Sequence, residues 1–147
     1  MSIRKDTCIE RTIRIKFETP FNYDGNQIES VRIDHRHYTE GCEQDENPIS
    51  LDVVAIGVKL TSNGKPDRRE KSGRLSSCGG AAHRIAAIAL DELGEEEELA
   101  QLLASEAIRI SSYLEFRNES PDVVQQYSIK QYAKLRPLVK AALKPAE

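Results

Sequence analysis

Basic side chains and glycines gather in the middle of the chain, where residues 65–84 hold a set that suits an anion. Five cations fall within ten residues, against two acids, and a sixth cation follows one turn into a predicted helix. Glycine lets a ligand approach the backbone closely, and free N–H groups at a helix start attract anions. Basic side chains beside such a start are what a phosphate needs. The segment therefore predicts an anion-binding site made of Lys65, Arg68, Arg69, Lys71, Arg74, Ser77, Gly79, Gly80 and Arg84.

The same segment has a plainer interpretation, which the residues alone favour: a solvated edge strand followed by a flexible helix start. It does not match the P-loop, because it has no Gly-Lys-Ser/Thr. It does not match the dinucleotide-binding fingerprint either, because its glycines follow a polar strand. It also lacks the interleaved aromatic residues of a surface that stacks single-stranded bases. An anion site there remains a hypothesis.

A cysteine nucleophile is a second hypothesis, because Cys78 lies at the predicted helix start, where a thiol can be activated. Its base would have to be a histidine. His83 lies on the same helix and is poorly placed to reach back, and His35 or His37 could reach only if the tertiary packing brings them there. Each cysteine more often serves as a small buried hydrophobe. We expect no catalytic residue.

A metal site is a third hypothesis, because His35 and His37 share one face of a predicted strand and Cys42 follows shortly after. Zinc would need a fourth ligand from elsewhere, and no second pair has ligand spacing. The acidic run at residues 91–98 is typical of a solvated helix start. We expect no metal and no cofactor.

Four strands are predicted from alternating or continuous apolar residues in the first half of the chain. Residues 9–19 alternate apolar and charged, and Pro20 is expected to end that strand. Asp24-Gly25-Asn26 and Ser62-Asn63-Gly64-Lys65 are turn sequences. The other predicted strands are residues 27–38, residues 49–61, which are apolar on both faces and therefore central, and a polar edge strand at 68–75.

Three helices are predicted from the change to a helical period after Ser76. Residues 80–93 are apolar on nearly all sides, which indicates a buried helix with Ser76 or Ser77 as N-cap. Residues 95–117 form the second helix, and Ser120-Pro121 begins the third. Pro137 is expected to kink or split that third helix.

These elements predict a single α+β domain over residues 1–147, β-rich in 1–75 and helical in 76–147, with a four-stranded antiparallel sheet packed against three helices. The net charge of −3 lacks the strongly basic balance of a dedicated duplex-DNA binder. Three cysteines indicate a reducing compartment, and no apolar stretch suits a signal peptide or a membrane span. We expect a cytoplasmic protein.

The function favoured by these residues is non-enzymatic binding: a small homo-oligomer that captures an anionic small molecule, such as a nucleotide, or a nucleic-acid backbone. Self-association is suggested by the apolar excess of the third strand and third helix. Two alternatives stay open. One is a protein–protein adaptor or inhibitor, such as a phage or defence-system accessory protein, and the other is a cysteine- or metal-dependent hydrolase.

Overall fold

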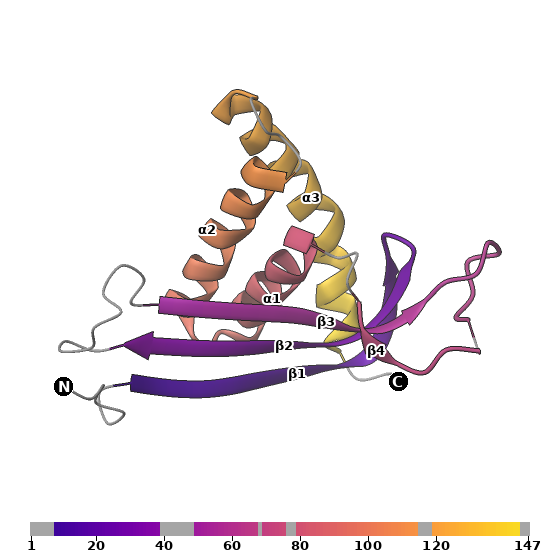
Figure 1. Cartoon of the computed structure of the whole chain (residues 1–147). Coiled ribbons are helices and arrows are strands. Elements are labelled where there is room, and N and C mark those ends of the chain that lie inside the picture. Colours follow the sequence, from indigo (N-terminus) through magenta and orange to yellow (C-terminus); the bar gives the residue numbers. More distant parts are fainter. Residues whose placement is uncertain (1–7, 39–48, 68, 76–78, 115–118, 145–147) are drawn as a thin grey trace.

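The fold is a four-stranded antiparallel sheet followed by three helices that cover one of its faces, as predicted (Figure 1). The computed structural model describes residues 8–38, 49–67, 69–75, 79–114 and 119–144. The elements are β1 (Cys8–Tyr23), β2 (Asn26–Tyr38), β3 (Ile49–Lys59), β4 (Gly73–Arg74), α1 (Gly79–Leu93), α2 (Glu97–Leu114) and α3 (Pro121–Ala142).

The strands lie in the sheet in chain order, β1-β2-β3-β4, so each pairs with the strand that follows it. β1 and β2 meet at the predicted tight turn, where Asp24 and Gly25 have φ of 51° and 76°. Two consecutive residues of positive φ match the right-handed twist of a hairpin. The pairing of Ile13 with Ile33, and of Ile33 with Val53, then aligns apolar residues across three strands.

Two strand predictions were wrong in their extent. β1 does not end at Pro20 but continues to Tyr23, with a shift of register between Lys16 and Phe21. Proline is tolerated there because β1 is an edge strand and this stretch is irregular. β4 is only Gly73–Arg74, because the preceding residues 69–72 are exposed and the Asp67 carboxylate accepts the backbone N–H of Arg69, which favours a turn.

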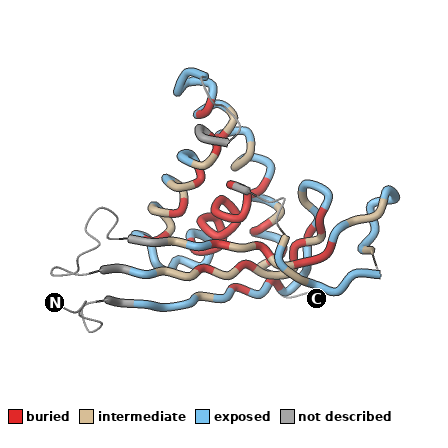
Figure 2. Tube along the Cα trace, viewed as in Figure 1, coloured by how far each residue is buried: buried red, intermediate tan, exposed pale blue. Residues whose placement is uncertain are grey.

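The core lies between one face of the sheet and α1. Ile15, Val31 and Ala55 share that face with their apolar neighbours, and α1 is buried at every residue from 80 to 90. Figure 2 shows α1 as an almost continuously buried helix between the sheet and the other two helices. The prediction that this helix is buried is confirmed. All three described helices lie on this side of the sheet (Figure 1). The side chains that alternate with the core residues lie on the opposite face, which none of these helices covers.

α2 and α3 flank α1, and α3 also reaches back to β1, where the Tyr23 hydroxyl donates to Gln131 Oε1. Ser120 takes the predicted N-cap position of α3 without a side-chain cap bond. The helix continues through Pro137 to Ala142, so the predicted split does not occur. The predicted N-cap serines of α1 and the predicted end of α2 at residue 117 lie outside the described residues. No helix within the described ranges is both long and apolar enough to span a bilayer.

Candidate anion-binding surface

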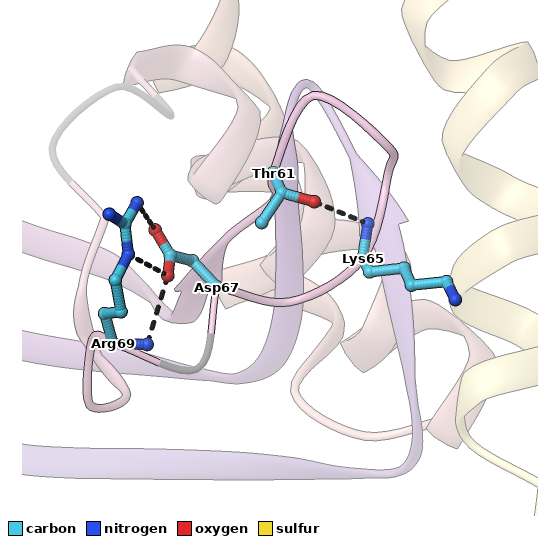
Figure 3. Close-up of polar contacts among 4 residues, drawn as sticks. All are labelled: Thr61, Lys65, Asp67 and Arg69. Atoms are coloured by element: carbon cyan, nitrogen blue, oxygen red, sulfur yellow. Dashed lines mark hydrogen bonds and ion pairs between the residues drawn. The ribbon is translucent and has the colours of Figure 1, made fainter.

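The four hairpin cations that the structure describes, Lys65, Arg69, Lys71 and Arg74, are all exposed to solvent. Arg69 turns onto Asp67, with its Nε 3.1 Å from Oδ1 and its Nη2 3.1 Å from Oδ2 (Figure 3). These hydrogen bonds lower the pKa of the Asp67 carboxyl and raise the pKa of Arg69. Lys65 extends away from this pair, so the two neighbouring cations do not converge (Figure 3).

Arg84 is separated from these exposed cations because it is buried among the three helices, with 1% of its surface exposed. Its Nη2 donates to Ser111 Oγ on α2, and its guanidinium lies 5.2 Å from the ring centroid of Tyr127 on α3. Gly80 lies one turn before it, and a Cβ there would be 3.6 Å from Nη2. Arg84 and the exposed hairpin therefore do not form one surface. Arg68 and Ser77 lie outside the described residues, and of Gly79 the structure shows only that it begins α1.

A different group of cations comes together on the helix-free face of the sheet. Arg14 on β1 pairs directly opposite Arg32 on β2. In the next row of this face, Lys16 pairs with Ser30, Ser30 with Ile56, and Ile56 with Arg74. Side chains in adjacent rows of one face are about 7 Å apart, and direct partners about 5 Å. We name Arg14, Lys16, Arg32 and Arg74 the cationic face.

Few acidic side chains neutralise the positive charges of the cationic face. Arg32 Nε lies 3.3 Å from Asp34 Oδ2 without forming a hydrogen bond, and Arg74 Nη2 lies 4.0 Å from Asp52. Both acids belong to the neighbouring row, and Asp34 also accepts a 2.7 Å hydrogen bond from the Thr12 hydroxyl. Arg14 makes no ion pair with any described residue. Like charges directly opposite each other destabilise a sheet, which makes this arrangement costly unless an anion compensates it.

Apolar side chains lie among these cations. Val54 pairs with Arg32 and Ile56 pairs with Arg74, and both side chains are half-buried on the sheet. A ligand lying there would therefore contact positive charge and a small apolar surface together. Sequence reasoning identified Arg74 and missed the other three residues. The alternation of Arg14 and Lys16 with Ile13 and Ile15 indicates that both cations share the outer face of β1. The sequence alone does not show which residues of the next strand lie opposite them.

A depression of about 580 Å³ lies next to the cationic face, toward the start of β1 and the end of β2. Its lining includes Thr12, Asp34 and Asp52, together with cations that already have acidic partners. Arg36 Nε lies 2.6 Å from Glu10 Oε1, and the Arg11 guanidinium makes two 2.6 Å hydrogen bonds to Glu96. Mixed and paired charges make this depression a weaker anion site than the neighbouring rows.

The residues of the hydrolase hypotheses are only partly described. Cys42 and Cys78 lie outside the described residues, as do the side chains of Cys8 and His37. His35 is half-buried on β2, and His83 is buried on α1, where desolvation lowers its pKa. Within the described part of the chain, no three His, Cys, Asp or Glu side chains are grouped as a metal site would need.

Comparison with known proteins does not assign this chain to a family. No protein-family description matches the chain, and no curated protein or solved structure matches it significantly.

Proposed function

We propose that this chain is a non-enzymatic binding protein that holds the phosphate groups of a nucleic acid on its cationic face. The observation that carries the proposal is the direct pairing of Arg14 with Arg32, with Lys16 and Arg74 in the next row. These two rows contain four cations and no acid. Neutralised phosphates release counterions, so a local cationic group binds polyanions even on a chain whose net charge is −3.

The exposure of Arg14, Lys16 and Arg74 suits a backbone rather than an enclosed small ligand. The cations lie on the sheet face that none of the described helices covers, and they come from three of its strands. Val54 and Ile56 lie beside them and could contact sugars or bases, although no described aromatic residue accompanies them as a stacking partner in these rows. We therefore expect binding dominated by charge, with strong salt dependence and weak sequence preference.

Binding of fluorescently labelled 20-nucleotide DNA, single-stranded and duplex, tests this proposal at several salt concentrations. The triple variant R14Q/K16Q/R32Q should raise the Kd at least tenfold at 50 mM salt. Its slope of log affinity against log salt should fall by about 2 for the single strand, because each lost phosphate contact removes about 0.7. Circular dichroism of the variant checks that the sheet remains folded.

The matched control is K130Q/K134Q/K140Q, which makes the same change of net charge on exposed positions of α3. It should leave the Kd within about twofold, because a local charge group acts mainly within a Debye length. No binding by the wild-type protein at 50 mM salt would refute the proposal. An equal loss of affinity in the control variant would also refute it, because binding would then follow net charge alone.

A further inference from the structure

Arg84 is a buried charge without a carboxylate partner among the described residues. Its side chain is nine-tenths buried or more, and it makes one hydrogen bond, from Nη2 to Ser111 Oγ, and one contact with the Tyr127 ring. Its Nε is buried and has no hydrogen-bond partner. Buried guanidinium groups are normally paired, because an uncompensated charge is costly to remove from water. None of the described residues supplies a negative group to Arg84.

Arg84 and the hydroxyl groups that interact with it have hydrogens left to donate. Arg84 Nε–H points from α1 without an acceptor, and Ser111 Oγ, which accepts from Nη2, keeps its own hydroxyl hydrogen. Tyr132 Oη on α3 is also buried and unpartnered, and Arg84 acts electrostatically on that hydroxyl. A cation on α1 and a hydroxyl donor on α2, with a second hydroxyl on α3 within its electrostatic reach, form an environment that suits an oxyanion. A water molecule there would leave the positive charge uncompensated.

We propose that Arg84 and Ser111 bind a small oxyanion, a carboxylate or a phosphate group, in the junction of α1, α2 and α3. The Nε and Nη2 edge of a guanidinium matches two oxygens of such a group. The Tyr127 ring is half-buried and covers the guanidinium on the α3 side. This site is separate from the cationic face, which lies on the helix-free side of the sheet.

The resonance of the Arg84 Nε–H group in ¹⁵N-labelled protein reports on this site directly. Sodium phosphate and sodium acetate are titrated separately, with sodium chloride holding the ionic strength constant. We expect a saturable shift of that resonance and a rise of several degrees in Tm with at least one anion. A response to acetate alone identifies a carboxylate ligand, and a response to phosphate alone identifies a phosphate ligand.

Two variants make the test specific. R84M, which keeps the side-chain length and removes the charge, should lose the anion-dependent rise in Tm, and S111A should weaken the affinity at least fivefold. The cationic-face variant R14Q/K16Q/R32Q should keep both responses, so failure here is distinct from failure of the proposed nucleic-acid binding. The proposal is overturned if neither anion shifts the wild-type Arg84 resonance, which would indicate water only, or if S111A binds as tightly as the wild type.

Discussion

At the residue scale, His83 on α1 is 8% exposed, and its Nδ1 is buried without a hydrogen-bond partner among the described residues. Desolvation lowers the pKa of its imidazole below the ordinary value of 6.5. Glu106 and Asp52 oppose this shift, whereas Arg109 and Arg84 reinforce it. The folded protein therefore holds His83 neutral at a pH where the unfolded chain binds a proton.

This difference predicts a loss of stability in acid. Below about pH 6.5 the unfolded state binds more protons than the folded state, so the free energy of unfolding falls as the pH falls. Above that pH, His83 does not reduce the free energy of unfolding. Below it, the free energy of unfolding falls because of His83 by at most about 1.4 kcal/mol per pH unit. Urea denaturation of wild type and His83→Leu at pH 5 and pH 7.5 measures it. The variant should lose less stability in acid than the wild type, and an equal loss would contradict the assignment.

The candidate sites show why residue chemistry alone was an incomplete guide. Glycines and cations close together in the sequence indicated one anion site, but Arg84 turns into the helices while Arg69 pairs with Asp67 in solvent. Conversely, Arg14 and Arg32 are 18 positions apart in the sequence and become direct neighbours through strand pairing. Composition identifies the available charges, but register and side-chain direction decide which of them meet.

At the element scale, Pro137 lies inside α3 and is exposed, and the helix continues on both sides of it. Proline has no N–H, so the helix loses the hydrogen bond that would reach the carbonyl of Ala133. We expect Pro137→Ala to raise the free energy of unfolding by about 1 to 3 kcal/mol, because alanine restores that bond and has a higher helix propensity. Chemical denaturation measures the change.

Val123→Ala, at an exposed position of the same helix, serves as the comparison and should change stability by less than about 0.5 kcal/mol. If Pro137→Ala instead destabilises the protein, a local bend at Pro137 must help Leu138 and Val139 to pack against the core. Far-UV circular dichroism would then show no gain of helix signal.

Most elements of this fold were predictable because their periods are strong. The alternation of β1, the continuous apolar run of α1 and the Ser120-Pro121 start of α3 each indicate one structure. The wrong predictions concern the points where two strands begin or end. Pro20 does not stop an edge strand whose pairing is already irregular, and the polar residues before Gly73 lack the apolar contacts that would hold a longer β4.

At the scale of the whole molecule, one core joins the sheet to all three helices, and Leu135 of α3 is fully buried in it. We expect Leu135→Ala to cost about 2 to 5 kcal/mol, the range for a leucine cavity. Because a single core of this size unfolds cooperatively, amide protection should fall together at Val31 in β2 and Ile88 in α1. Native-state hydrogen exchange tests this, and a loss confined to α1 would show that sheet and helices are separate units.

Self-association, and the alternative of an adaptor or inhibitor, stay predictions for this chain. The exposed apolar residues Ile108, Val123 and Ile129 on α2 and α3 are compatible with either role. Scattered apolar residues are also normal on the surface of a monomer, so they do not favour one partner over another.

The contact between α3 and β1 has a consequence for synthesis on the ribosome. Tyr23 and Gln131, which join these elements, are 108 positions apart in the chain. At about 5 to 20 residues per second, roughly 5 to 20 s pass between their translation. The hairpin of β1 and β2 can form at once, but the apolar side of β1 then stays uncovered until α3 emerges. Nascent chains paused before that point should therefore be the species most dependent on a chaperone.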